Sequence, residues 1–441
     1  MLDRSFTTVG LLSIVLMAAS LIVLLQPIVW RGLQAFVYRQ TVEGREMRLE
    51  VLGRGGREDV DREKALAREA RRPVYEAMEA FEAEMREGGY ELRSRYRSEY
   101  GEFEDLLSEL LGPLPGEDEP VLIRDRYGRT RWERALVAMD HLLYIEEYDY
   151  SNPDRMGVPV SRPRSELFAG TALFPAFGYI EENIEEIMRP RWTFYWRFLF
   201  DKSYDAHFFG GIWPEMLGTL YLALGAMIFA VPLGVVTAIY LAEYAGTGRF
   251  VSLLRTCISS LAGVPSIVFG LFGLAFFINT IEVSHGKSVL AGSMTLALLV
   301  LPTVIRASEE AILAVPGTYK EAAMSLGAGK WRTIVSVILP AALPGILTSI
   351  IISLGRAAGE TAPIIFTAAV SVGKPLAFWE TLGQPSPALP WNIYNLATEH
   401  EAVDEIRHVQ YGMVLTLVAL VLLLNLTAIL IRARVSKKLR G

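Results

Sequence analysis

The sequence predicts an all-α integral membrane protein with about six transmembrane helices and a separate α-rich soluble domain. Hydrophobic residues make up 51% of the 441 residues. The charges are segregated, because residues 31–210 hold 27 of the 43 basic and 36 of the 49 acidic residues, whereas residues 211–441 carry a net charge of +3. Uncharged runs of about 20 residues, the length that crosses a bilayer as a helix, recur in residues 211–441 and at the N-terminus.

The first uncharged run covers about Val9–Trp30. A cleaved secretory signal is the alternative interpretation. The run is long for the apolar region of a signal peptide, however, and no small-residue cleavage site follows Trp30. We therefore expect residues 1–30 to form a retained transmembrane anchor helix.

Residues 31–210 are predicted to form an extracytoplasmic insert of about 180 residues, which is long enough for its own core. Residues 58–111 are rich in Glu, Arg, Ala and Leu, which favour helix, and Pro73 is expected to divide this stretch into two helices. We expect a short hairpin within residues 121–132 and a helix at about 133–144. The mixed charges indicate a solvated surface, and no catalytic constellation is evident.

Five further spans are predicted in residues 211–441. Several contain Gly or Pro, which membrane helices tolerate when neighbouring helices satisfy the freed backbone groups. The expected spans are about Ile212–Leu241, Cys257–Ile278, Val289–Ile305, Ala341–Val370 and Tyr411–Ile431.

The orientation of the spans follows from Lys and Arg in short loops, which favour the cytoplasmic side. The tail after the last span is basic, and counting back along the chain makes residues 318–332 cytoplasmic as well. Both termini are then expected in the cytoplasm and residues 31–210 outside it. The basic residues of the tail are Arg432, Arg434, Lys437, Lys438 and Arg440.

Several chemistries have no support in the sequence. No basic patch is interleaved with aromatic residues, so nucleic acid is not an expected partner. The five histidines are scattered and show no metal-ligand spacing, and the single cysteine, Cys257, cannot form an intrachain disulfide. Lys287-Ser288 resembles the end of a phosphate loop, but Ile281 stands where the pattern needs glycine. We expect no cofactor, metal or catalytic residue in this chain.

One spaced motif lies between the fourth and fifth spans. Glu321, Ala322 and Ala323 are followed after three residues by Gly327, and after nine more by Val337-Ile-Leu-Pro340. A short helix is expected to start at Thr318 or Tyr319, with Glu321 in its first turn, where negative charge suits the helix dipole. The alanines would let a partner surface approach closely, and Gly327 would end the helix in a left-handed conformation. The alternative is an amphipathic connector without special function.

This pattern resembles the EAA loop of ABC importer permeases, with Val337 in place of isoleucine. The resemblance implies that residues 211–441 form a permease core and that residues 318–340 carry the coupling segment. In that family the loop is a coupling helix that sits in a cleft of a separate ATPase subunit. The chain would then be a channel-forming transport subunit of the inner membrane and not an enzyme, with ATP bound by the partner ATPase.

Charged residues also lie within or at the ends of predicted spans: Arg306 at the end of the fourth, and Arg356 and Glu360 inside the fifth. A charge at mid-bilayer costs about 2.5–3.5 kcal/mol on insertion scales, so such groups normally face a bundle interior or an aqueous path. Two interpretations remain open. The arginines pair locally, with Glu360 or with Glu309 or Glu310, or they line an anion pathway, because guanidinium groups bind tetrahedral oxyanions in a bidentate manner.

The segment Arg356-Ala-Ala-Gly-Glu360-Thr361-Ala-Pro363 is similar to the RxxGETAP segment of phosphate-importer permeases of the PstA type, and the insert resembles an extension found in some of them. The resemblance implies import of inorganic phosphate, with Arg306 and Arg356 on the substrate path and Glu360 and Thr361 beside it. Its implied partners are a homologous second permease, an ATPase dimer, a periplasmic phosphate-binding protein and membrane lipid. Permeases for another oxyanion or small solute, and a membrane sensor, are the alternatives.

Overall fold

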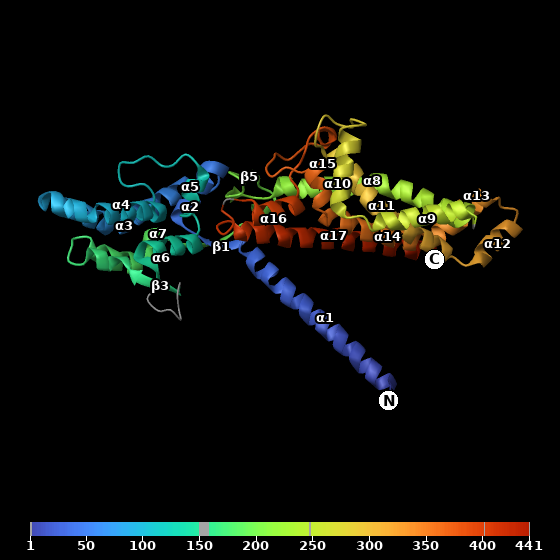
Figure 1. Cartoon of the computed structure of the whole chain (residues 1–441), viewed down its shortest axis with the longest axis horizontal. Coiled ribbons are helices and arrows are strands. Elements are labelled where there is room, and N and C mark those ends of the chain that lie inside the picture. Colours follow the sequence, from blue (N-terminus) through green and yellow to red (C-terminus); the bar gives the residue numbers. More distant parts are fainter. Residues whose placement is uncertain (1, 150–157, 247, 401, 441) are drawn as a thin grey trace. The chain divides into compact units, whose positions relative to one another are not determined.

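The computed structural model describes residues 2–149, 158–246, 248–400 and 402–440 (Figure 1). The chain divides into two compact units. The membrane unit comprises Met1–Leu33, Arg197–Ala206 and Gly210–Gly441, and the insert unit comprises Gln34–Trp196 and His207–Phe209.

The insert unit is mainly helical. Its strands form two-stranded antiparallel pairs, with β1 beside β4 and β2 beside β3. In chain order the elements are β1 (Val37–Gln40), α2 (Val42–Leu52), α3 (Arg57–Glu87), α4 (Gly89–Leu111), α5 (Ile123–Tyr127), α6 (Trp132–Leu143), β2 (Tyr144–Asp149), β3 (Val158–Pro163), η2 (Arg164–Phe168), α7 (Phe174–Met188) and β4 (Arg191–Phe194).

Two expectations for the insert are wrong. Helix α3 continues through Pro73, and the break lies instead at Gly88 and Gly89, the latter with φ +70°. The proline removes one backbone hydrogen bond, but Val74 and Met78 just beyond it are buried in the core and hold the helix together. The expected hairpin within residues 121–132 is the short helix α5. The helix expected at about 133–144 is confirmed as α6.

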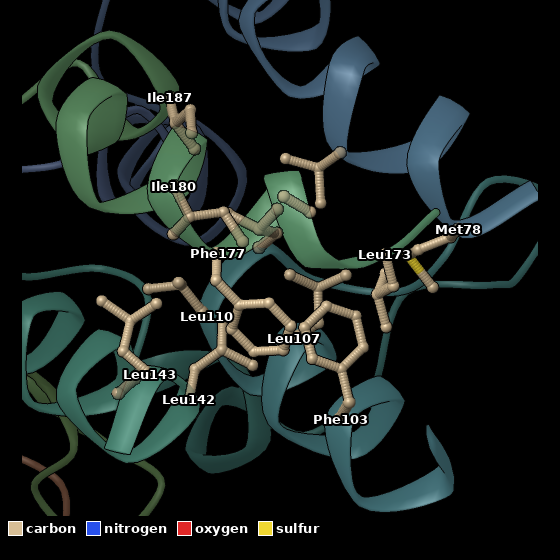
Figure 2. Packing of buried hydrophobic residues seen from close by; sticks show 14 of the residues in the cluster. Met78, Phe103, Leu107, Leu110, Leu142, Leu143, Leu173, Phe177, Ile180 and Ile187 are labelled. Carbon is tan, nitrogen blue, oxygen red and sulfur yellow. The ribbon is translucent and has the colours of Figure 1, made fainter. Parts of the chain in front are cut away.

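One apolar core joins helices α3, α4, α6 and α7 of the insert. Figure 2 shows leucines from α4 and α6 meeting Phe177 and Ile180 of α7, with Met78 of α3 at one side. Phe103 and Phe177 lie with ring centroids 5.2 Å apart in a tilted arrangement. Aromatic pairs of this kind contribute about 0.5–1.5 kcal/mol beyond the burial of their area.

The core also contains a buried ion pair. Arg71 of α3 and Glu43 of α2 are joined by a 3.2 Å contact, and each side chain is 9% exposed. The guanidinium further donates to the carbonyl oxygens of Leu111, at 2.9 Å, and Ile187, at 3.4 Å. The arginine therefore ties four helices together at one point.

The membrane unit contains five helices that are long and apolar enough to cross a bilayer, or up to six spans if one bent pair is counted as a span. This confirms the prediction of about six. Its elements are α1 (Leu2–Leu33), η3 (Trp196–Leu199), β5 (Ser203–Tyr204), β6 (Phe209–Gly210), α8 (Trp213–Ile239), η4 (Tyr240–Tyr244), α9 (Arg249–Ala262), α10 (Ser266–Gly273), η5 (Leu274–Ile278), α11 (Val289–Leu313), α12 (Gly317–Ser325), α13 (Lys330–Thr333), η6 (Ile334–Ile338), α14 (Leu339–Gly359), α15 (Ala362–Thr367), η7 (Phe378–Leu382), α16 (Leu389–Thr398) and α17 (Arg407–Arg440).

Small residues let the spans pack closely. A Cβ atom added at Gly234 of α8 would lie 2.6 Å from Cγ1 of Val304 in α11, and one at Gly345 of α14 would lie 2.6 Å from Cβ of Ala311. These contacts are closer than side-chain carbons can approach, so only glycine fits. Helix α11 therefore packs tightly against both α8 and α14, as expected where lipid supplies no hydrophobic driving force.

The C-terminal end of helix α1 contacts α17. There the backbone of Gly32 lies against Leu415, and Arg31 donates a 3.2 Å hydrogen bond to the hydroxyl of Tyr411. Towards its N-terminus α1 diverges from the other helices (Figure 1), and the apolar side chains from Val9 onward are exposed. A surface of this composition suits contact with lipid.

Three predicted spans differ in detail. The third is a pair of helices, α9 and α10 with η5. The two are bent by 100° at a short break, and Pro265 is the last residue of that break. The fourth continues to Leu313, so Arg306 lies within the helix and not at its end. The fifth covers Lys330–Gly359 and stops before residue 370. It ends at Gly359 because, in a continuous helix, the ring of Pro363 would collide with the Gly359 carbonyl four residues earlier.

Candidate functional site

Arg306 lies at a contact between α11 and α9. Its Nη2 group donates to the hydroxyl of Ser259 and, at 3.4 Å, to the carbonyl oxygen of Arg255. The side chain is 43% exposed. The guanidinium thus sits at the surface of the membrane unit beside a hydroxyl-bearing helix, and not deep among apolar side chains.

Glu309 lies behind this contact and is only 4% exposed. One of its oxygens is 2.7 Å from Nη2 of Arg255, and the other is 3.8 Å from Nη1 of Arg306. The buried carboxylate of Glu309 therefore lies close to the guanidinium groups of both Arg255 and Arg306. The three side chains together carry a net positive charge. Because a buried charge is costly without partners, Glu309 also fixes where both guanidinium groups lie.

Arg356 and Glu360 form a second polar pair. Nε of Arg356 lies 3.4 Å from Oε1 of Glu360, and the side chains are 40% and 20% exposed. Glu360 has extended backbone at the break between α14 and α15, and Thr361 begins the next helical turn. A Cβ atom added at Gly359 would meet nothing within 4 Å. The break therefore places the side chains of Arg356 and Glu360 and the backbone of Gly359 beside open space.

The structure thus contains the local pairing that was one of the two interpretations, for both arginines. It also leaves both guanidinium groups about two-fifths exposed, so the pairing does not occupy them fully. Within residues 158–246, 248–400 and 402–440, no ion pair or hydrogen bond joins the Arg306 cluster to the Arg356 pair. The two are separate positive positions in one unit.

The spaced motif forms an exposed helical turn, α12. Glu321 is the fifth residue of this helix, so the expectation that it lies in the first turn is wrong, because the helix already begins at Gly317 after Pro316. Glu321 and Ala322 are exposed, and Ala323 is half-buried. Leu326, which follows the helix, is 90% exposed.

Gly327 ends α12 as expected. It has φ +83°, and its N–H donates to the Met324 carbonyl at 2.9 Å. The N–H of Ala328 donates to the Ala323 carbonyl at 3.1 Å. Together these bonds form a Schellman motif, which satisfies the last carbonyl groups of the helix and requires a left-handed residue at position 327.

Two lysines attach this loop to the end of α8. Lys320 forms an ion pair with Glu243, and the ammonium group of Lys330 lies 4.6 Å from the centroid of the Tyr244 ring. Both partners belong to the π-helical turn η4. Reasoning from the sequence missed Glu243 because it lies 77 residues before Lys320. Arg255 was missed for the same reason, because its partner Glu309 lies far along the chain.

In the part of the chain that the structure describes, no group of three His, Cys, Asp or Glu side chains lies close enough together to hold a metal ion. The chemistry available at the site is therefore that of guanidinium, hydroxyl and carboxylate groups. Such a set binds anions by charge-assisted hydrogen bonds.

Comparisons with known proteins give a consistent picture. A family model described as "Binding-protein-dependent transport system inner membrane component" matches residues 210–441. Phosphate transport system permease protein PstA 1 of Mycobacterium tuberculosis is 39% identical over 233 residues, which cover 53% of this chain and 73% of that protein. The probable ABC transporter permease protein YqgI of Bacillus subtilis is 33% identical over 253 residues, covering 55% and 85%. A structure of the MetNI methionine ABC transporter in an inward-facing conformation covers 51% of this chain and 94% of its own, with 18% identity and a TM-score of 0.39.

Proposed function

Because the chain belongs to the family of binding-protein-dependent transport system inner membrane components, we propose that it is the permease subunit of an ATP-driven importer that moves inorganic phosphate across the bacterial cytoplasmic membrane by alternating access. A relative that is 39% identical carries the name phosphate transport system permease, which supports phosphate as the substrate. The observation that carries the proposal is the pair of half-exposed arginines, Arg306 and Arg356, on helices of the membrane unit.

In this proposal the arginines offer successive positions for the anion. Arg306 and Arg356 each keep part of the guanidinium exposed although each is paired with a carboxylate. Such pairing lowers the affinity for an anion to a level from which it can leave, which a conducting path requires. Glu360 and Thr361 lie beside Arg356 at the break between α14 and α15.

The α12 helix is proposed to couple the permease to its motor. It presents Glu321, Ala322 and Ala323 on a short helix that Gly327 ends. A separate ATPase subunit would receive this helix, bind the ATP and hydrolyse it. Because an ATPase dimer offers two such clefts and this chain offers one loop, a homologous second permease completes the assembly.

We further propose the orientation and the remaining partners. The basic tail after the last span places the C-terminus in the cytoplasm, and with six spans the N-terminus lies there too. The insert unit then faces the periplasm, where a phosphate-binding protein delivers the substrate. Membrane lipid covers the apolar faces of the spans.

The direct test is uptake of radiolabelled phosphate at micromolar concentration, in cells that lack other phosphate importers and express the complete assembly. We expect saturable uptake that stops when the ATPase partner is inactivated and falls about tenfold or more in Arg356→Gln, since a charge-assisted contact is lost. Uptake of another oxyanion in the absence of phosphate uptake would contradict the assignment of the substrate.

Glu360 provides a test of selectivity. Phosphate near neutral pH carries a proton that a carboxylate can accept in a hydrogen bond, whereas sulfate carries none and is repelled. Glu360→Gln is therefore expected to let sulfate compete with phosphate uptake. Glu310→Gln, at an exposed position of α11, is the matched control. Unchanged discrimination in a well-expressed Glu360→Gln variant would place selectivity elsewhere.

A further inference from the structure

The helix α9 carries a continuous polar face that the proposed path does not use. Serine, threonine and arginine side chains recur at intervals of three and four residues, which places them on one side of the helix. The opposite side is apolar, and Phe250 on it is 70% exposed. The polar face consists of Ser252, Arg255, Thr256, Ser259 and Ser260.

This face lines a cavity of about 560 Å³, and Arg306 of α11 closes the other side. The volume falls within the range of about 300–1,000 Å³ that is typical of ligand sites. Among the described residues that line the cavity none is a carboxylate, and Glu309 is buried beside the two arginines. The walls therefore combine two guanidinium groups with four hydroxyl groups.

One hydrogen-bond donor of the Arg255 guanidinium group is left without an acceptor in the described part of the chain. Its Nη2 group is engaged by Glu309 at 2.7 Å and by the carbonyl oxygen of Leu241 at 3.0 Å. Its Nε–H group is buried and has no hydrogen-bond acceptor in the described part of the chain. A buried donor without an acceptor is uncommon in folded proteins and points to a missing partner. Because this nitrogen is buried, an anion in the adjacent cavity would instead bind the exposed part of the Arg255 side chain, which is 39% exposed.

We propose that Arg255 and the hydroxyl face of α9 form, together with Arg306, a binding site for a protonated tetrahedral oxyanion. The arginines would bind the charged oxygens, and the serine and threonine oxygens would accept the hydrogen bond of the acidic proton. Glu309 is a positioning residue that holds both arginines. This inference rests on the proposed function and adds a position to its path.

The location of the cavity along the membrane unit indicates what a bound anion would do during transport. Arg306 lies seven residues before the end of α11 at Leu313, and α12 begins four residues after that end. The cavity is therefore close to the end of the unit that carries the coupling helix. An anion held here would occupy the last protein site before release on that side.

Protection of an introduced thiol tests the site without relying on transport. The complete assembly is purified with Cys257→Ser to remove the native thiol and Ser260→Cys to report on the cavity. Its reaction with a negatively charged thiol reagent is followed with inorganic phosphate, with sulfate, or with chloride at equal ionic strength. Phosphate is expected to slow the reaction about fivefold, and the added change Arg255→Gln should abolish the protection. Phe250→Cys on the apolar face is the control, and phosphate should leave its rate unchanged.

Phosphate uptake then separates this inference from the proposed function. Arg255→Gln should reduce the maximal uptake rate about tenfold, whereas Arg249→Gln, on the same helix but outside the cavity, should match the wild type. If phosphate is imported but the thiol is never protected and Arg255→Gln transports normally, the polar face serves packing and the inference is wrong. If phosphate protects the thiol and sulfate does not, but the assembly imports no phosphate, the site stands and the assigned transport substrate is wrong.

Discussion

The ammonium group of Lys320, in the exposed helix α12, forms an ion pair with the carboxylate of Glu243 in the π-helical turn η4. The carbonyl oxygen of Leu241 in the same turn accepts a hydrogen bond from Arg255, which lines the cavity proposed to bind an oxyanion. One short turn therefore contacts both the coupling segment and the proposed binding site. Turns of this type are frequent at functional sites. A displacement of α12 has a direct route to Arg255 through η4.

Charge reversal tests whether this contact transmits motion. Lys320→Glu or Glu243→Lys alone places like charges together, and Glu243 is only 9% exposed, so its partner matters. We expect each single variant to import about tenfold less phosphate per ATP hydrolysed in proteoliposomes, and the double variant to recover most of the loss. The ratio of phosphate imported to ATP hydrolysed is the measured quantity.

Arg332→Glu is the matched control for this experiment, because it makes the same change of charge near the same loop. It should leave the ratio near that of the wild type. If the effects of Lys320→Glu and Glu243→Lys simply add in the double variant, the ion pair does not couple the two segments.

The buried ion pair of the insert should contribute far more than an exposed pair of the same chemistry. Glu43→Gln leaves Arg71 buried and uncompensated, which is expected to lower the free energy of unfolding by about 3–5 kcal/mol. Glu76→Gln removes the exposed partner of Arg72, at 74% and 58% exposure, and should lower the free energy of unfolding far less. Denaturant unfolding of the full chain in detergent compares the two. Equal losses would mean that other contacts satisfy Arg71.

The parts of this structure that could be predicted from the sequence are local. Long apolar runs indicate spans because bilayer thickness sets their length, and α12 ends at Gly327 because the Schellman motif needs a left-handed residue there. Each of these inferences depends on residues within a few positions of one another. The break after Gly359 was not among the expected features, since the fifth span was predicted to run on to Val370.

The features that were missed depend on tertiary contacts. Pro73 is held inside α3 by the burial of Val74, which composition alone does not reveal. The partners of Lys320 and Arg255 lie on other helices, and helical periodicity carries no information about which helices meet. The Arg356 pair was found from the sequence only because its carboxylate is four residues away.

Packing of α8 on α11 predicts a severe effect at one glycine. Gly234→Val would place side-chain atoms within 2.6 Å of Val304, so the helices must separate, at a cost of about 1–3 kcal/mol. Gly286→Val is the control, because a Cβ atom there meets nothing within 4 Å. Thermal unfolding of the purified protein should show a lowered midpoint for Gly234→Val only. A similar midpoint for both variants would show that α8 and α11 can move apart freely.

The insert should also show a pH dependence that originates at Glu104. Burial, with repulsion from Glu82 as the second cause, raises the pKa of Glu104 above its usual value of 4.5. The folded state then holds this proton more tightly than the unfolded state, so the contribution of Glu104 to stability is greatest below pH 4.5 and is lost as the pH rises through the raised value. Glu104→Gln, which stays neutral, is therefore expected to stabilise α3 and α4 at pH 7.5 and to have little effect at pH 4. Hydrogen exchange of peptides from these helices in the full chain measures the change, with Glu109→Gln as the exposed control. A gain of the same size at both pH values would mean that glutamine acts through packing and not through the lost charge.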